Sequence, residues 1–449
     1  MPTRLTSVVV LALLFTTGLD PLITRPDAPS GIAWADDDDD DDDRRSSPRT
    51  RRDDSGLTPF SPRTRQPQRT APRPRTATPA PAPQPDFAPD EIVTLGLSGD
   101  DLALLVVQGF AVIEETDVPG LAATPRRLAP PDGLTLADAR DVIRALPTGE
   151  DADFNHFYRS EQGFSEDCQG SDCPARRMID WDIPPDRTST CGNSVPIGMI
   201  DTGINEEHET FAGAHLDVKR LGPDNFDRSR ALHGTAVAAL LVGDPQTRSP
   251  GLVPGTRLVA VDAFYRTDGD ERADIFTLLK ALGHLADEGV MVINLSLAGP
   301  ANAVLEESLR RLVFDEDIVV VSAVGNSGPG VDPEYPAGYD AVIAVTAVDR
   351  DGAIYRRAVR GAHVDLAAPG VNVWTAASVS GARFKTGTSF AVPFVTAAAA
   401  LVREARPDLD AVAVGQRLRE WATDLGDPGH DDTFGAGLLN ISGLCDPTL

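Results

Sequence analysis

The feature that most constrains the fold is a series of short, continuously apolar segments that alternate with helical patterns in the second half of the chain. Five such segments are predicted to be strands, at residues 196–200, 258–263, 290–297, 318–323 and 342–348. Helical patterns fall near residues 233–242, 275–285 and 305–313. Strands without polar alternation are typical of a parallel sheet covered on both faces. We therefore predict a doubly wound α/β domain with a mostly parallel sheet and functional residues at the carboxyl ends of its strands.

A smaller domain is predicted just before that sheet, over residues 90–159. The pattern gives strands at 91–95, 110–114, 126–128 and 153–158, with one helix at 102–107 and another from Thr135 to Ala145. Ser98 and Thr135 are placed to cap the two helices. The order strand, helix, strand, strand, helix, strand is typical of a small ferredoxin-like α+β unit.

The first 89 residues are predicted to lie outside both domains. Arg4 precedes an apolar run at 8–15, and residues 33–35 (Ala-Trp-Ala) form a small-x-small site, so residues 1–35 are predicted to be a signal peptide. A tail with an apolar patch is the alternative. Residues 36–89 open with eight aspartates and continue rich in Arg and Pro, which is typical of a disordered linker. We expect a secreted or periplasmic protein without a stable membrane anchor.

Charge and cysteine content narrow the partners and the compartment. The net charge of −27 argues against nucleic acid as a partner, because phosphate binding needs a positive surface. Four cysteines in an exported chain predict two disulfide bonds with three pairings open. We expect Cys168–Cys173 and Cys191–Cys445, since the second bond would tie the start of the large domain to its end.

Three short segments place a reactive side chain where a doubly wound fold would present it. Asp201 follows an apolar strand and precedes Thr-Gly; His233 is followed by Gly-Thr-Ala; Ser389 stands in Thr-Gly-Thr-Ser-Phe-Ala-Val-Pro before a long Ala-rich helix. Each has an ordinary alternative: a turn aspartate, a structural histidine, and an N-cap serine. The N-cap alternative does not explain Pro393 in the first turns of that helix or the Gly-Thr-Ser approach.

Taken together, the three segments resemble the subtilase family of serine peptidases, whose motifs Asp-Thr-Gly, His-Gly-Thr and Gly-Thr-Ser-x-Ala-x-Pro occur in this order. The resemblance covers about residues 184–444 of a predicted catalytic domain at 160–449. It implies a catalytic triad of Asp201, His233 and Ser389 that hydrolyses polypeptides through an acyl-enzyme.

Further segments match the same family. The resemblance implies that Asn326, in Ser-Ala-Val-Gly-Asn, donates to the oxyanion, and that Ser296, Leu297, Ala298 and Gly299 bind the substrate backbone beside the S1 pocket. Residues 365–370 match a signature that we interpret as structural. Calcium is common in the family and stays open here, but no residue is assigned to it and no other cofactor is expected.

Two sharper hypotheses depend on the resemblance. Residues 90–159 resemble the inhibitory propeptide of a zymogen, the alternative being an accessory domain that does not inhibit. Glu334, just before Tyr-Pro-Ala, stands where the family closes the S1 pocket, so a carboxylate there would favour Arg or Lys at P1, the residue before the cleaved bond. Arg159 would then be the self-cleavage residue. A glutamate facing solvent is the alternative.

Two other functions remain open at this stage. One is a catalytically silent binding protein built on the same fold. The other is a transpeptidase or peptide cyclase, which passes the same acyl-enzyme to an amine.

Overall fold

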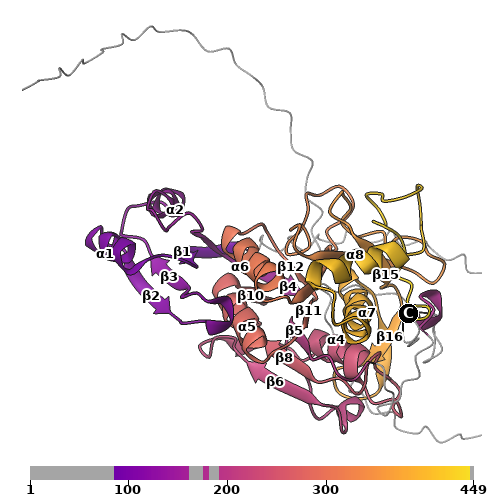
Figure 1. The fold of residues 1–449 in the computed structure, drawn as a ribbon. Helices are drawn as coiled ribbons and strands as arrows, with labels where there is room; N and C mark the ends of the chain where they lie inside the picture. Colours follow the sequence, from indigo (N-terminus) through magenta and orange to yellow (C-terminus); the bar gives the residue numbers. More distant parts are fainter. Residues whose placement is uncertain (1–84, 161–174, 182–191, 445–449) are drawn as a thin grey trace, which may run out of the picture. The chain divides into compact units, whose positions relative to one another are not determined.

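The computed structural model describes residues 85–160, 175–181 and 192–444, all within one compact unit at residues 84–449 (Figure 1). The predicted signal peptide and the four cysteines lie outside the described residues, as does nearly all of the predicted linker. In the described part of the chain, no helix is both long and apolar enough to cross a membrane.

A seven-stranded sheet forms the centre of the larger domain, and each of its strand pairs is parallel. Its strands, in spatial order, are β6 (Leu216–Arg220), β8 (Leu258–Asp262), β5 (Ile197–Asp201), β11 (Val292–Leu295), β13 (Val319–Ala323), β14 (Ile343–Val348) and β15 (Leu366–Pro369). The prediction of a doubly wound α/β fold with a parallel sheet is confirmed, and all five predicted strands are present.

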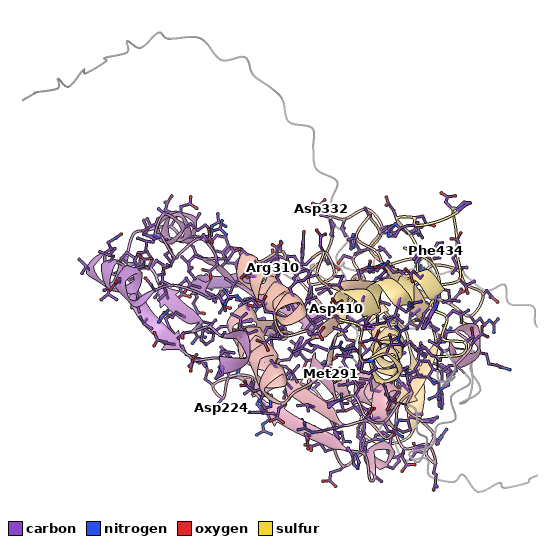
Figure 2. The ribbon with its side chains drawn as sticks, viewed as in Figure 1. Asp224, Met291, Arg310, Asp332, Asp410 and Phe434 are labelled. Atoms are coloured by element: carbon purple, nitrogen blue, oxygen red, sulfur yellow. The ribbon has the colours of Figure 1, made fainter. Side chains whose placement is uncertain are left out.

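Helices cover both faces of this sheet (Figure 1). On one face, α4 (His233–Val242) packs on β5 and β8, and α7 (Val392–Ala405) packs on β11 and β13. On the other, α5 (Ile275–Asp287) packs on β5, and α6 (Ala303–Phe314) packs on β13. Helix α8 (Ala411–Trp421) contacts β13 and lies against both α7 and α6. Side chains cap three of these helices: Asp274 caps α5, Asn302 caps α6, and Asp410, labelled in Figure 2, caps α8.

The start of α7 differs from the prediction. Ser389 was expected immediately before the helix, but it lies in a separate 3-10 turn, η3 (Thr388–Phe390), and α7 begins at Val392. Pro393 stands in the first turn of α7, where its missing N–H has no helical partner to lose. The serine is therefore held by a tight turn that leads into the helix.

The N-terminal domain contains four antiparallel strands and two helices in the predicted order. These are β1 (Phe87–Thr94), α1 (Gly99–Val107), β2 (Ala111–Glu115), β3 (Arg126–Ala129), α2 (Leu136–Arg144) and β4 (Asp153–Ser160), with a 3-10 turn η1 (Pro119–Leu121). The strands lie in the order β2-β3-β1-β4, which is the ferredoxin-like order. Ser98 caps α1 and Thr135 caps α2, as expected.

Strand β4 also pairs with two segments of the larger domain. One is β12 (Leu297–Ala298) and the other is β10 (Asp270–Asp274), which continues through β9 (Tyr265–Thr267) to β7 (Asp227–Arg228). The remaining elements are a hairpin of β16 (Val373–Ala376) and β17 (Ala382–Lys385), a 3-10 turn η2 (Glu209–Phe211) and a short helix α3 (Ala175–Met178). The two domains thus share a continuous sheet through β4.

Candidate active site

The site lies at the point where the strand order of the large sheet reverses. After β5 the chain builds β6 and β8 on one side of it, and it then returns to build β11 on the other. In open α/β sheets this arrangement leaves a crevice beyond the carboxyl ends of the two central strands. Asp201 is the last residue of β5, so its carboxylate stands at that crevice.

Asp201 and His233 form a buried pair. His233 begins α4, its side chain is fully buried, and its Nδ1 lies 2.7 Å from Asp201 Oδ1. The same carboxylate oxygen accepts a hydrogen bond of 2.7 Å from the N–H of Thr202. A β-carbon at Gly234 would overlap the carbonyl oxygen of Thr202, so only glycine lets α4 approach β5 this closely. This close approach explains the glycine that follows the histidine.

Ser389 lies beside this pair through its neighbours on the turn. The ring of Phe390 stands 5.2 Å from the imidazole of His233, measured between ring centres. The carbonyl oxygen of Ser389 accepts a hydrogen bond of 2.9 Å from Ser296 Oγ. The structure therefore brings the regions of Asp201, His233 and Ser389 together, although they come from β5, α4 and η3.

Asn326 presents an amide group to the same turn. Its Oδ1 accepts hydrogen bonds of 3.1 Å from both the N–H and the hydroxyl of Thr388. Its Nδ2 is buried and has no hydrogen-bond partner among the described residues. Because an unpaired buried donor is costly, an amide anchored in this way is well prepared to bind an acceptor that enters the crevice.

The predicted substrate-binding segment, residues 296–299, runs along the edge of the crevice. Asn294 Nδ2 donates to Ser296 Oγ over 2.8 Å, which orients that hydroxyl towards Ser389. Leu297 and Ala298 form β12. Gly299 and Tyr335 exchange two backbone hydrogen bonds of 2.8 and 2.9 Å, so this segment lies next to the one that contains Glu334.

Glu334 lies against the residue that precedes Asn326. A β-carbon at Gly325 would overlap Glu334 Oε2, and the φ of +95° at Gly325 also favours glycine. Glu334 Oε1 accepts a hydrogen bond from Ser327, whereas Oε2 is buried without a partner among the described residues. Burial raises the pKa of this carboxyl, and the hydrogen bond from Ser327 opposes part of that rise.

Arg159 does not lie where the sequence suggested. Its guanidinium binds Asp270, with Nε 3.1 Å from Oδ1 and Nη2 2.9 Å from Oδ2, and not Glu334. The hypothesis that Arg159 is the P1 residue facing Glu334 is therefore wrong. The cause is strand register: Arg159 pairs with Ala298 on β12, which directs its side chain towards the β9–β10 hairpin.

A second carboxylate beside the pair was missed by the sequence analysis. Asp262 ends β8 next to Asp201, and Ser229 links the two strand ends: its Oγ donates to Asp262 Oδ1 over 2.8 Å and accepts from the N–H of Gly203 over 2.7 Å. Arg220 donates to the other oxygen of Asp262 over 2.9 Å. Burial raises the pKa of Asp262, opposed by these hydrogen bonds. The available signal was a second apolar strand ending in aspartate.

Metal ligands are not grouped in the described part of the chain. Within residues 85–160, 175–181 and 192–444, no three His, Cys, Asp or Glu side chains lie close enough to hold a metal ion together.

A hydrogen-bonded aspartate and histidine at the switch point of a doubly wound sheet, with a serine on an adjacent turn, are characteristic of serine-type hydrolases. The model of the subtilase family matches residues 192–437, more than half of the chain. The chain therefore belongs to the subtilase family, and it is a serine endopeptidase whose substrates are polypeptides.

Individual relatives agree with this assignment. Subtilisin DY of Bacillus licheniformis is 34% identical over 260 residues, which are 56% of this chain and 90% of that protein. The self-cleaved protease domain of PatA has 28% sequence identity and a TM-score of 0.50, covering 57% of this chain and 97% of that one. Fervidolysin from Fervidobacterium pennivorans has a TM-score of 0.63 over 81% of this chain and 62% of its own, and at 19% identity it supports the fold alone.

Proposed function

We propose that Asp201, His233 and Ser389 are the catalytic triad of this peptidase and that Asn326 stabilises the oxyanion. The observation that carries the proposal is the buried hydrogen bond of 2.7 Å between His233 Nδ1 and Asp201 Oδ1. A carboxylate on Nδ1 keeps the proton on that nitrogen, and Nε2 is then the basic nitrogen of the ring. Asp201 also stabilises the imidazolium that forms when Nε2 takes a proton.

In the proposed reaction His233 accepts the proton of Ser389 Oγ as this oxygen attacks the scissile carbonyl carbon. The carbonyl oxygen becomes negatively charged, and it accepts hydrogen bonds from Asn326 Nδ2 and from the backbone N–H of Ser389. His233 then donates the proton to the leaving amine, which breaks the peptide bond and leaves an ester on Ser389. Water hydrolyses the ester by the same steps.

Labelling by a phosphonylating active-site reagent tests this assignment. The parent protein should be labelled at Ser389, and Ser389→Ala should lose both the label and at least about 10⁴-fold in kcat. A parent protein that takes no label would instead indicate a silent binding protein. Mass spectrometry of the products separates the remaining alternative, because a transpeptidase or cyclase joins the acyl group to an amine where a hydrolase releases a free carboxylate.

We also propose that Glu334 favours Arg or Lys at P1. Three features support this: the carboxyl lies against Gly325 next to Asn326, the residue is half-buried, and its Oε2 is buried without a partner among the described residues. A cation entering beside it would pair with a charge that is otherwise costly to bury.

Comparing Glu334→Gln with the parent on substrates with Arg or Leu at P1 decides this point. The parent should prefer Arg, and the variant should lose that preference because it keeps the side-chain shape without the charge. Since burial raises the pKa of Glu334, the preference of the parent should also fall on acidification, as the carboxyl takes up a proton. An equal Arg/Leu ratio in the two proteins would contradict the proposal.

The N-terminal domain is proposed to be an inhibitory propeptide. Its support is that β4 runs antiparallel to β12, the proposed substrate-binding edge, with Arg159 opposite Ala298 and Ser160 opposite Leu297. The other edge of β4 pairs with β10, where Tyr158 lies opposite Ala273. An extended substrate would need the same backbone groups, so a docked β4 excludes it.

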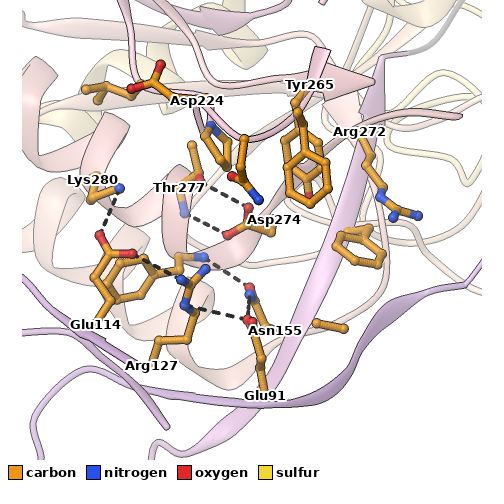
Figure 3. A pocket seen from close by; sticks show the side chains of 18 of the residues that line it. Glu91, Glu114, Arg127, Asn155, Asp224, Tyr265, Arg272, Asp274, Thr277 and Lys280 are labelled. Carbon is orange, nitrogen blue, oxygen red and sulfur yellow. Dashed lines mark hydrogen bonds and ion pairs between the residues drawn. The ribbon is translucent and has the colours of Figure 1, made fainter. Parts of the chain in front are cut away.

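Polar contacts help to hold this domain in place, beside the apolar contact of Val118 and Leu121 with the larger domain. Asp153 Oδ2 accepts from the first N–H of α6 over 3.1 Å, and Asn155 Oδ1 accepts from the N–H of Phe276 in α5 over 3.2 Å. A cavity of about 540 Å³ lies along the junction, and in it Lys280 of α5 points towards Glu114 of β2, with 3.2 Å between Nζ and Oε1 (Figure 3). Water can replace contacts of this kind, which suits a domain that must be released.

Inhibition in trans tests the propeptide proposal. A fragment of residues 85–160 added to the mature enzyme should inhibit it, whereas a matched fragment ending at residue 156 should not, because it lacks the part of β4 that pairs with β10 and β12. If the longer fragment leaves activity unchanged, the domain is an accessory unit instead.

Export is the last part of the proposal. It is supported by the apolar run and the Ala-Trp-Ala site near the N-terminus. Amino-terminal sequencing of Ser389→Ala protein, which cannot process itself, should give a start near residue 36 when the protein is recovered outside the cytoplasm. An intact N-terminus on protein confined to the cytoplasm would contradict export.

A further inference from the structure

Strand β4 shows how an extended peptide lies between two edges of the larger domain. On one side Arg159 pairs with Ala298 and Ser160 with Leu297; on the other, Tyr158 pairs with Ala273. Given the proposed function, a substrate would occupy the same place with the same chain direction. The side chains of β4 therefore mark the positions where substrate side chains would lie.

The register fixes which substrate position Arg159 represents. Ser296 directly precedes β12, and its hydroxyl donates to the carbonyl of Ser389 over 2.9 Å. A substrate residue opposite Ser296 would therefore carry the carbonyl that Ser389 attacks. Counting back along an antiparallel strand, the residue opposite Ala298 lies two positions earlier, at P3.

Arg159 forms a bidentate ion pair with Asp270 at that position, and its Nη2 also donates to the carbonyl oxygen of Pro85 over 2.8 Å. Nε lies 3.1 Å from Asp270 Oδ1 and Nη2 lies 2.9 Å from Asp270 Oδ2. Asp270 is buried, with 6% of its surface exposed. A bidentate pair of this kind matches the planar guanidinium and cannot be reproduced by the single ammonium group of lysine.

Asp270 is itself held in place from the other side. Arg272 Nη1 donates to Asp270 Oδ2 over 3.0 Å. The guanidinium of Arg272 in turn lies over the rings of Phe157, at 3.9 Å, and Tyr265, at 6.0 Å, with Tyr265 beside it in Figure 3. Because Tyr265 and Arg272 belong to the β9–β10 hairpin, the carboxylate does not depend on the N-terminal domain alone for its position.

We propose that Asp270 is a specificity-determining residue that selects arginine at P3 of the substrate. This inference rests on the proposed function, because it takes β12 and β10 to be the edges that bind substrate. It adds a second cation-selecting carboxylate to Glu334, which would act two substrate residues away. The substrate class is therefore polypeptides with arginine two residues before the residue at the cleaved bond.

The test compares peptide substrates that differ only at P3. The full chain is produced, allowed to process itself, and assayed on fluorogenic peptides with Arg, Lys, Ala or Glu at P3 and a constant residue at every other position. The parent should show kcat/KM about tenfold or more higher for Arg than for Ala, the order expected for hydrogen bonds to a charged group. Lys should fall between Arg and Ala, and Glu should be the poorest.

Two variants of the same hairpin give a matched comparison. Asp270→Asn should bring the Arg/Ala ratio close to one, whereas Asp268→Asn removes the same charge from the exposed turn and should leave the ratio as in the parent. Asp270→Glu, which keeps the charge in a longer side chain, should retain part of the preference and guards against a folding defect in the asparagine variant.

Each contrary result is distinct. A parent enzyme that cleaves all P3 peptides equally well would overturn the inference while leaving the proposed function intact. An Arg preference at P3 that survives in Asp270→Asn would overturn the assignment to Asp270. An Arg preference at P2 or P4 instead of P3 would overturn the register. A protein that cleaves none of the peptides and takes no label at Ser389 would overturn the proposed function itself.

Discussion

The seven-stranded sheet and the N-terminal domain are stabilised in different ways. In the sheet, β5, β8, β11, β13 and β14 are wholly buried, and their only charged residues are the aspartates that end β5 and β8. The N-terminal domain has a separate core of only eight buried apolar residues. The residues of η1 and β4 that face α5 and β12 pack instead into the core of the larger domain.

On the proposal that the N-terminal domain is a propeptide, this difference separates the part of the molecule that stays folded from the part that is released. A continuous apolar core is lost only when the domain unfolds, because water cannot replace its contacts. The N-terminal domain is attached by the pairing of β4 with β10 and β12, by helix caps, by the ion pairs Lys280–Glu114 and Arg159–Asp270, and by an apolar contact of η1 with α5. Substitutions in the crevice should therefore change catalysis without changing docking, and substitutions at the junction should do the reverse.

The largest expected effect is on the catalytic side. Asn326→Ala removes the amide that the crevice leaves without a partner among the described residues, and we expect kcat to fall by about 10²–10³, a magnitude that was measured within this enzyme family. KM and the exchange of β4 amides with deuterium should change little. A fall in kcat of less than threefold would contradict the assignment of Asn326 as the oxyanion residue.

A substitution at the junction should give the opposite pattern. Gly283, in α5, lies against Val118, and a β-carbon there would overlap the valine side chain. Overpacking of this kind costs about 1–3 kcal/mol, so Gly283→Leu should speed deuterium exchange in β4 by roughly 10- to 100-fold.

The measurement uses uncleaved Ser389→Ala protein, so that both domains remain in one chain. His284→Leu, on the same helix but facing Lys219, is the matched control and should exchange like the parent. If Gly283→Leu leaves β4 protected, the junction is less tightly packed than the structure indicates.

The smallest expected effect depends on pH. His156 of β4 accepts a hydrogen bond of 2.8 Å from Asn302 Nδ2 on its Nδ1, which it can do only when that nitrogen is unprotonated. Burial lowers the pKa of His156 from its usual 6.5, with Arg140 adding to this and Asp153 and Asp86 opposing it. Because the released domain binds this proton more tightly than the docked one, docking should weaken as pH falls below 6.5 and be constant above it.

Deuterium exchange of β4, corrected for the intrinsic effect of pH, checks this in the same uncleaved protein. The parent should lose protection several-fold between pH 7.5 and 5.5, and His156→Gln should lose less. Glu91 has the opposite effect on docking, because burial raises the pKa of its carboxyl and the protonated form therefore favours the docked state. Equal pH dependence in parent and variant would exclude His156 as the titrating group.

Much of the fold could be predicted because the central strands are apolar without interruption. Edge strand β6 was missed because Leu-Asp-Val-Lys-Arg alternates with charge, which is how a strand with one exposed side differs from a buried one. The candidate triad and Asn326 could be predicted because their motifs are local, each defined by neighbours in the sequence.

Features that depend on register could not be predicted. Whether Arg159 faces Glu334 or Asp270 is decided by which residue of β12 it pairs with, and a shift of one residue would turn the side chain to the other face. Asp270 itself lies on a hairpin of mostly polar residues that carries no apolar pattern. Such pairings follow from tertiary structure, which the sequence specifies only through contacts between distant residues.

On the propeptide proposal, the position of β4 as a shared strand has a consequence for its competition with substrate. A strand tethered to its own binding edge acts at an effective concentration of about millimolar, so a free peptide at ordinary concentration displaces little of it. Cutting the chain after β4 does not by itself remove β4 from between β10 and β12. It converts β4 from a tethered competitor into one that can diffuse away. After the cut, dilution of the released domain determines how quickly β10 and β12 become available to substrate.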